Sequence, residues 1–514
     1  MVAWRDLFGK RCETCFARPP WTKESPEWKQ LDARLPADHV ARRMMAAVAL
    51  LDLRPLFASY SPGGTDAVRP DLLLCVVFIE IWSGRQRPSQ WFRDMQENYV
   101  LQWAGMGICP SRSTWYNFRD RQGPFLDQWL RQALQIAREH GLTPARRGSL
   151  DGSLLAANAS RHHLLNEERL SKRQAALATC YAHDRQGEAS EAVPGWMAKT
   201  PATRVEQAHR YERAQARLQE FQAINQRQNP ARRRPRAKIV VSATDPESGL
   251  GPDKLKVFRP LYNLQLLRDL DSPLTLAFDV FAQHTDGGTF HPMLRRAREA
   301  MRLPLAEMAT DASYVTACNL AICAAEKVTL YGPWQENDYT EQPKDRGPRM
   351  IRKEEFTWLP EENQYRCPQG HPLKWIGREK RVQGDGQINV MHRYRCAPEH
   401  CRQCPRQPQC TKNPARGRAV KRSEHEDLIV AHRTRMQTEE AKATYRLRKQ
   451  TVELGYADLK ENRGLRGFSG RGLVRARIEA GLNELARNLL IVERELRTRG
   501  IQNQIPQHAC HDTS

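Results

Sequence analysis

Long hydrophobic runs are missing from this sequence of 514 residues. The two longest, Met44–Leu51 and Leu72–Ile79, have eight residues each, whereas a helix that spans a bilayer needs about 20. Met1–Phe16 also lacks the apolar core of a secretory signal peptide. We therefore expect a cytoplasmic protein without a membrane span.

Acidic residues are also in short supply. The chain has 59 Asp and Glu against 81 Lys and Arg, which gives a net charge of +22 and a pI near 9.7. Such an excess favours a polyanionic partner, and nucleic acid is the first candidate. The alternative is a ribosome-associated protein or a merely soluble basic protein. Because 40% of the residues are hydrophobic, the chain is long enough to fold into about two to four domains.

A disulfide framework of the secreted type is absent, because most of the 13 cysteines are dispersed. The exception is a cluster of five: Cys367, Cys396, Cys401, Cys404 and Cys410. A cluster of this kind in a cytosolic chain favours metal binding, and four thiolates around a CxxC core can hold a structural Zn²⁺ ion. We assign Cys367, Cys401, Cys404 and Cys410 as its ligands, with Cys396, His371 and His400 as substitutes. The alternative is a set of reduced structural cysteines.

Two kinds of periodicity divide the chain. Helical spacing of apolar residues runs from Asp38 to His140, and the basic side chains there suit helix-turn-helix DNA binding. A plain helical cap is the alternative. Strand patterns follow, separated by two helices at Phe290–Met301 and Tyr314–Glu326. The expected strands are Leu150–Ala156, Lys238–Asp245, Leu274–Phe281, Leu305–Thr310 and Val328–Tyr331. Three strands followed by strand–helix units predict a mixed α/β sheet covered by helices.

Insertions interrupt this pattern. Residues 161–238 hold 16 Lys and Arg against 8 Asp and Glu, and they resemble a basic helical insertion between two strands. The expected division is a flexible leader (1–36), a helical DNA-binding domain (37–143), a catalytic core (144–160 and 237–335), the basic insertion (161–236), a Cys-rich insertion (336–422), the C-terminal helices of the core (423–498) and a tail (499–514).

Three acids occupy unusual positions in this pattern. Asp151 lies inside an apolar strand, Asp311 ends the fourth strand, and Glu453 lies between apolar residues of a later helix. A buried strand does not accept an acid unless something pairs with it, and two metal ions about 4 Å apart require carboxylates from different elements. The strand order fits a ribonuclease-H-like fold. Asp279 and Glu461 are competing acids, and each acid alone could be an ordinary strand-end or surface residue.

The surroundings of Glu453 are the most informative. Tyr445, Arg448 and Lys460 flank it, and in a helix these spacings place Glu453 and Lys460 on one broad face. A carboxylate beside cations can hold metal while Lys and Arg bind phosphates. The alternative is a solvated helix with ion pairs.

Together these motifs resemble the DDE-type transposases of bacterial insertion sequences, in the branch with a cysteine-rich insertion before the final glutamate. The resemblance covers most of the chain. It rests on Leu150-Asp-Gly-Ser, Thr310-Asp-Ala-Ser-Tyr314 and Tyr445…Arg448…Glu453…Lys460…Arg463-Gly464. Two departures stand out. Four residues separate Arg448 from Glu453 where the wider family usually has three, and Ala312-Ser313 replaces an expected Gly before Tyr314.

The resemblance implies DNA cleavage at transposon ends and strand transfer into target DNA. Asp151, Asp311 and Glu453 would hold two Mg²⁺ (or Mn²⁺) ions. By the same resemblance, DNA would be bound by Tyr445, Arg448, Lys460 and Arg463. The partners would be double-stranded DNA, as terminal inverted repeats and as target, and further copies of the chain in a homodimer or larger assembly at the nucleoid. A catalytically inactive DNA-binding relative and another ribonuclease-H-like nuclease are the alternatives.

Overall fold

A computed structural model describes residues 16–60, 66–186, 193–228, 230–334, 351–382 and 386–501. The leader and tail expected at 1–36 and 499–514 lie partly outside these residues. Within the described part of the leader, helix α1 (Pro26–Arg34) forms because Trp28 is buried and stacks on Trp103. The irregular leader therefore does not extend over this segment.

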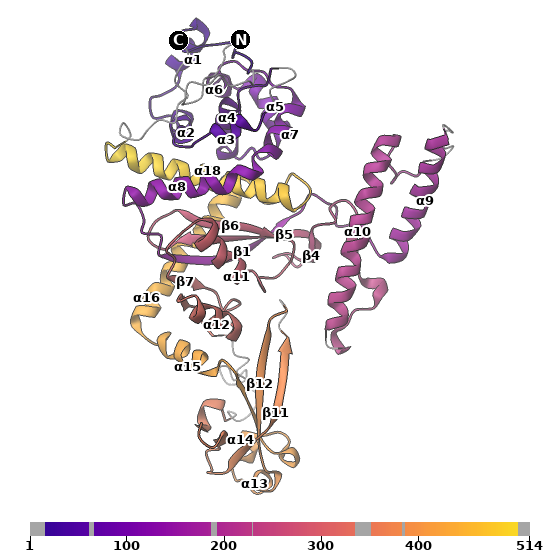
Figure 1. Cartoon of the computed structure of the whole chain (residues 1–514), viewed down its shortest axis with the longest axis vertical. Coiled ribbons are helices and arrows are strands. Elements are labelled where there is room, and N and C mark those ends of the chain that lie inside the picture. Colours follow the sequence, from indigo (N-terminus) through magenta and orange to yellow (C-terminus); the bar gives the residue numbers. More distant parts are fainter. Residues whose placement is uncertain are drawn as a thin grey trace.

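The N-terminal unit is helical, as expected, and its helices gather at one end of the molecule (Figure 1). Almost every residue of α4 is buried, so this helix forms the centre of the unit. None of the described helices is both long and apolar enough to cross a bilayer. The other helices are α2 (Val40–Val48), α3 (Arg54–Ala58), α5 (Pro88–Glu97), α6 (Tyr99–Ala104), α7 (Arg112–Arg121) and α8 (Leu126–Glu139), and α4 spans Pro70–Trp82.

A mixed sheet of six strands forms the middle of the molecule. Its order is β4-β5-β1-β7-β8, and β6 also pairs with β5. β1, β7 and β8 are parallel, whereas β5 is antiparallel to β1, β4 and β6. The strands are β1 (Arg147–Ala156), β4 (Gly249–Pro252), β5 (Phe258–Asp269), β6 (Thr275–Phe281), β7 (Glu307–Thr310) and β8 (Thr329–Tyr331), with helices α11 (Phe290–Arg295) and α12 (Ala317–Ala325) between the later strands.

The second strand of this sheet is not the one expected from the sequence. Within Lys238–Asp245 only Val241–Ser242 is extended (β3), and it pairs with β2 (Leu164–Leu165) outside the sheet. The position beside β1 belongs to β5 instead. The sequence did not predict β5, because three buried polar residues interrupt its apolar pattern: Asn263, Gln265 and Arg268. Their polar groups form hydrogen bonds or ion pairs with other elements, and these offset the cost of burying them.

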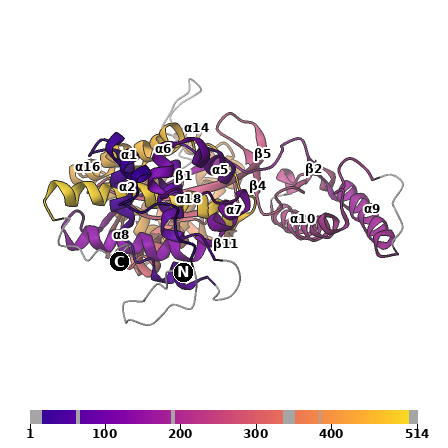
Figure 2. The same ribbon diagram turned by 90° about the horizontal axis from the view of Figure 1, so that it is seen from above.

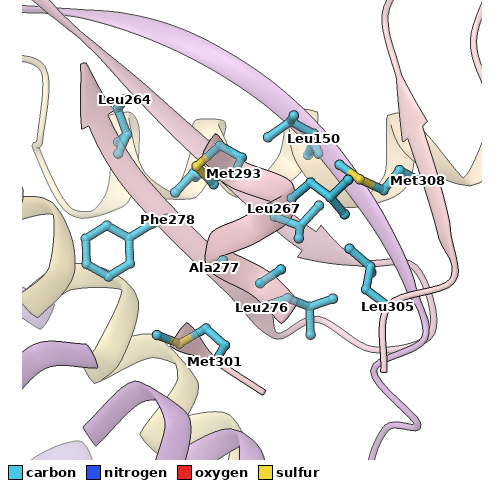
Figure 3. Packing of buried hydrophobic residues seen from close by; sticks show 14 of the residues in the cluster. Leu150, Leu264, Leu267, Leu276, Ala277, Phe278, Met293, Met301, Leu305 and Met308 are labelled. Atoms are coloured by element: carbon cyan, nitrogen blue, oxygen red, sulfur yellow. The ribbon is translucent and has the colours of Figure 1, made fainter. Parts of the chain in front are cut away.

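The core of the sheet is packed by aliphatic side chains from both strands and helices (Figure 3). Leu150 of β1, Leu267 of β5 and Met308 of β7 are fully buried in one cluster with Met293 of α11. Burial of such side chains is the main stabilising contribution to a fold of this size. It also fixes which face of β1 points away from the core.

Two parts project from this centre. Helices α9 (Glu167–Gln186) and α10 (Pro201–Arg227) form an arm that stands apart from the sheet in both ribbon views (Figures 1 and 2). A second sheet, in the order β13-β12-β11-β10-β9, lies at the end opposite the N-terminal helices. It contains β9 (Thr357–Leu359), β10 (Gln364–Arg366), β11 (Pro372–Val382), β12 (Ile388–Cys396) and β13 (Ala419–Ser423), with short helices α13 (Pro398–Arg402) and α14 (Gln407–Cys410).

Helices return after the second sheet: α15 (Glu426–Arg435), α16 (Glu439–Arg448), α17 (Leu454–Ala457) and α18 (Leu473–Thr498). The long helix α18 lies between the N-terminal helices and the sheet (Figure 1). Its Glu484 is almost fully buried and pairs with the equally buried Arg268 of β5 at 3.2 Å. The hydroxyl of Thr275 on β6 also donates to Glu484.

Removal of Arg268 should therefore be costly. Arg268→Met leaves the buried carboxylate of Glu484 without its cation, and we expect a loss of about 3–5 kcal/mol in the free energy of unfolding. The double variant Arg268→Met/Glu484→Met removes both charges and should recover most of that loss. Urea unfolding of the wild type, Arg268→Met and the double variant measures it. If the double variant is no more stable than Arg268→Met, the pair does not act as described.

A second prediction concerns pH. Glu80 of α4 is buried, and burial raises its pKa to about 8, with further help from the negative charge of Asp94. A carboxyl group whose pKa rises on folding binds its proton more tightly in the folded state. It therefore stabilises the fold below its ordinary pKa of 4.5, and this contribution is lost as the pH rises towards about 8. Glu80→Gln stays neutral throughout. Its melting temperature should match that of the wild type in acid and exceed it above pH 8, and a difference independent of pH would contradict this.

Candidate active site

The pairing of β1 with β7 brings Asp151 and Asp311 to neighbouring positions. The two strands are parallel, and Leu150 lies opposite Thr310. The next residue on each strand is an acid. Because adjacent strands are about 4.8 Å apart, the two carboxyl groups lie close together where β7 ends. The register of this one pairing thus brings the first two acids together.

Asp151 is mostly buried and has one cationic partner. Arg448 of α16 lies 2.8 Å from its Oδ2, and the N–H of Gly152 donates to its Oδ1 at 2.8 Å. Burial raises the pKa of Asp151 to about 6; Arg448 lowers it, and the negative charges of Asp311 and Asp286 raise it. The ionised carboxylate would therefore be stabilised by a further cation.

Asp311 begins the loop after β7 and is oriented by its own loop. Ser313 donates to its Oδ1 twice, from the backbone N–H at 2.8 Å and from the hydroxyl at 2.6 Å. Ser313 belongs to the segment that departs from the family pattern. The hydroxyl of the buried Tyr314 donates to Gln265 of β5 at 2.7 Å. The substitution thus supplies an extra donor to the acid, and Tyr314 fixes the loop to the sheet.

Glu453 lies on a helix that runs without a break from α16 to Asn462 and includes two π-helical turns, Lys449–Glu453 and Asp458–Asn462. A π turn closes over five residues instead of four. Arg448 and Glu453 are five apart, so this turn keeps them on one face of the helix, as a spacing of four does in an α-helix. The hydroxyl of Thr451 lies 3.1 Å from the carbonyl oxygen of Arg448 and helps to satisfy the altered backbone. The longer gap between Arg448 and Glu453 is accommodated in this way.

Tyr445 lies within electrostatic range of all three acids. Burial raises its pKa, Arg448 lowers it, and the negative charges of Asp311, Asp151 and Glu453 raise it further. Glu453 itself is exposed, and it has no hydrogen bond or ion pair with any residue that the structure describes. The first two acids are therefore held in place, whereas the third is free to bind a ligand.

Lys460 and Arg463 have different environments. The Nζ of Lys460 donates to the hydroxyl of Ser153 on β1 at 2.6 Å, and burial lowers the pKa of this amine. Arg463 stacks over the ring of Trp82, donates to the carbonyl oxygen of Trp82 and pairs with Asp458. Lys460 thus contacts β1 two residues from Asp151. Arg463 connects the end of the helix that carries Glu453 to α4.

The two competing acids are occupied by ion pairs. Asp279 of β6 pairs with Arg296 at 3.1 Å and with Arg477 of α18 at 3.2 Å. Glu461 is exposed and pairs with Arg466. Neither is among the charges that shift the pKa of Asp151 or Tyr445.

Sequence reasoning missed Tyr456, which places the helix over the sheet. Its buried hydroxyl lies 2.8 Å from the carbonyl oxygens of both Asp151 and Leu264, on adjacent strands. Gly455 precedes it, and a Cβ atom there would lie 3.2 Å from the guanidinium of Arg268. Gly455 thus allows the helix to approach Arg268 of β5 closely, and Tyr456 bonds the helix to the sheet. A Gly followed by a Tyr was the one feature of the sequence that could have indicated this contact.

Sequence reasoning also missed Asp286, in the loop after β6. Its Oδ1 accepts hydrogen bonds from Asn263 at 3.0 Å and from Gln265 at 2.8 Å, both on β5. A Cβ atom at Gly152 would collide with this oxygen at 2.2 Å. Asp286 therefore adds a second negative charge near Asp151, besides that of Asp311, and Gly152 makes room for it. No local pattern marks Asp286, because its partners lie on a strand that the sequence conceals.

The donor set of the site suits a hard divalent ion. Within the described residues, no group of three or more His, Cys, Asp and Glu side chains is arranged so that it could hold a metal ion. The chemistry of the acidic site still fits Mg²⁺ or Mn²⁺, because carboxylate oxygens are the ligands such ions prefer. Burial raises the pKa of Asp151, and a bound cation would favour the ionised form of this carboxyl group.

The cysteine cluster forms part of the small core of the second sheet. Burial raises the pKa of Cys396 to about 12, and the nearby Cys401, Cys367 and Cys410 add to this shift. Cys367 and Cys401 each accept a backbone N–H at 3.3 Å, from His371 and Arg418. The thiols are thus near one another, but no metal-holding group is found among the described residues. The expected Zn²⁺ ion has no support here.

Comparison with known protein families gives a match in the C-terminal part of the chain. Residues 366–491 match the family model of the transposase DDE domain. The matched segment contains the whole helix with Tyr445, Arg448, Glu453 and Lys460, and it begins after Asp151 and Asp311. No curated protein matched the chain. The family match supports the interpretation of the chain as a DDE transposase.

Proposed function

We propose that the protein cuts DNA at transposon ends and joins the exposed ends to target DNA, with Asp151, Asp311 and Glu453 as ligands of two Mg²⁺ or Mn²⁺ ions. One observation carries the proposal: the β1–β7 register places two acids side by side, and a helix that matches the transposase DDE domain lies over them. The strand order β6-β5-β1-β7-β8, with its last three strands parallel, supports a ribonuclease-H-like core.

The proposed reaction has two substitution steps at phosphorus, a hydrolysis followed by a transesterification. In the first, the oxygen of a water molecule attacks the scissile phosphorus, and the 3′ oxygen of the transposon end leaves as a hydroxyl. In the second, that 3′ hydroxyl attacks a phosphorus of the target strand and displaces a target 3′ oxygen. Bound ions would activate the attacking oxygen and stabilise the charge that develops on the phosphate.

The chain's own residues position the DNA in this scheme. Arg448 neutralises Asp151 before substrate binds, and its exchange from the carboxylate to a phosphate is possible because only one ion pair, of 2.8 Å, holds it. Lys460 lies on the same side of β1, at Ser153. Tyr445 lies within electrostatic range of Arg448 and of the three acids. Because two ends must be joined, we propose that the DNA-bound form is at least a homodimer.

The Zn²⁺ ion expected between Cys367 and Cys410 is left out of this proposal, because the described thiols are not arranged around a metal. The burial that raises the pKa of Cys396 and of Cys410 favours protonated, packed thiols at these two positions.

Carboxamide variants test the acids. Asp151→Asn, Asp311→Asn and Glu453→Gln should each lower Mg²⁺-dependent strand transfer by more than about a hundredfold, because loss even of a group that only supports a metal ligand costs 10–100-fold. Glu440→Gln, an exposed acid on the same helix, is the matched control and should be unaffected. The assay joins duplexes that carry the element's own terminal repeats to a plasmid.

The same assay separates the alternatives. A wild-type protein that binds the ends but neither cuts nor joins them is the inactive relative. Cleavage of branched junctions without end joining identifies another nuclease. Full strand transfer by any one of the three acid variants removes that acid from the assignment.

A further inference from the structure

A cavity of about 730 Å³ lies beside the candidate active site, where the N-terminal helices meet the sheet. Its walls come from the start of α5, the segment that follows β1 and the loop 464–472. Three arginines line it, Arg87, Arg466 and Arg471, and its lining contains no Asp or Glu. The lining also contains His163 and Phe468, and Phe468 is buried and packs against Tyr262. The cavity is therefore suited to an anion.

A further arginine, Arg210, does not line the cavity but lies close enough to Arg471 for their charges to interact. Arg210 comes from α10 of the arm, and its Nε is buried without a hydrogen-bond partner among the described residues. Burial lowers the pKa of Arg210, and the positive charge of Arg471 lowers it further. Two guanidinium groups thus lie near each other, and each has a negative charge within electrostatic range, Glu206 for Arg210 and Asp245 for Arg471. Arg466 pairs with the exposed Glu461. An anion bound in the cavity would add to this compensation.

The loop 464–472 is held rigidly in place. The N–H of Phe468 donates to the carbonyl oxygen of Ala156 at 2.9 Å, so the loop runs beside the end of β1. The buried carboxylate of Glu479 accepts the N–H groups of Ser469 at 2.7 Å and Gly470 at 2.6 Å. Arg466 and Arg471 therefore project from a fixed loop, which reduces the entropy lost when they bind a ligand.

Strand β1 leads from the acids to the cavity. Asp151 is five residues from Ala156, a distance of about 17 Å at 3.3 Å per residue. A DNA strand covers that distance in about five nucleotides at 3.4 Å each. Lys460 lies between them at Ser153, and the positive charge of Lys254 lowers the pKa of its amine. Positive charge thus continues from the acids to the arginines.

We propose that this arginine pocket binds phosphodiester groups of the DNA strand that passes through the active site, about five nucleotides from the scissile phosphate. The proposal rests on the proposed function in so far as that function makes DNA the substrate. It adds a second anchoring point, built by the N-terminal helices, the segment at the end of β1 and the loop 464–472. The DNA backbone is recognised there by charge and without base readout.

Salt dependence tests the proposal directly. Binding of a dye-labelled duplex of arbitrary sequence is followed by fluorescence anisotropy in EDTA over a range of salt concentrations. Arg87→Gln, Arg466→Gln and Arg471→Gln should each weaken binding and lower the slope of log K against log salt by about one, and the triple variant by about three. The corresponding Arg→Lys variants keep the charge and should keep most of the slope.

Arg138→Gln is the matched control. Arg138 is exposed near the end of α8, where His140 contacts Arg499 just beyond α18. The pocket lies near the opposite end of α18, whose 26 residues span about 39 Å. The control should leave the slope unchanged.

Two results would overturn the proposal. One is a triple variant whose slope equals that of the wild type or falls no more than that of Arg138→Gln. The other is tight binding of a nucleoside monophosphate at the arginines with no change in the DNA slope, which would make the pocket a small-molecule site. Because EDTA prevents catalysis, the slope is measured whether or not the protein cuts DNA. A lowered slope together with an absence of cleavage would keep the pocket and remove only the proposed function.

Discussion

The buried ion pair between Arg268 and Glu484 is the interaction on which the arrangement of the other parts depends. It joins β5, the strand beside β1, to the middle of α18. Other buried polar residues of α18 reach different elements. Glu493 pairs with Arg43 of α2, Glu479 pairs with Arg119 of α7, and Asn488 bonds to both backbone groups of Thr275. One helix thus fixes the N-terminal helices, the sheet and the loop 464–472 relative to one another. Such contacts are directional, and this favours one arrangement over the many that apolar packing alone would allow.

The sequence predicted four strands of the sheet, β1, β6, β7 and β8, within a few residues. β5 was missed because Asn263, Gln265 and Arg268 are compensated by Asp286 and Glu484, which are distant in the chain. Lys238–Asp245 has a better strand composition, yet it lies at the base of the arm. Propensity is a local property, whereas the compensation of a buried polar group is a property of the whole fold.

The site shows the same division. The positions of Asp151, Asp311 and Glu453 follow from motif and pattern, but their surroundings do not. Arg463 was expected to bind DNA, and it is largely occupied by Trp82 and Asp458. Tyr456 seemed unimportant in the sequence, although its hydroxyl contacts both central strands. The chemistry of a side chain is readable from its type, whereas its partners are set by the register of strands and the placement of helices.

The π turn at Lys449–Glu453 makes the third acid depend on the geometry of a single turn. In an α-helix each residue advances by about 100° around the axis. If this turn relaxed to an ordinary α-helical turn, Glu453 would rotate by about that amount relative to Arg448, while Tyr456 held the following turn against the sheet. The carboxylate would then point in another direction relative to Arg448 without any movement of a domain. The extra residue between Arg448 and Glu453 therefore makes the direction of the Glu453 side chain depend on the π turn.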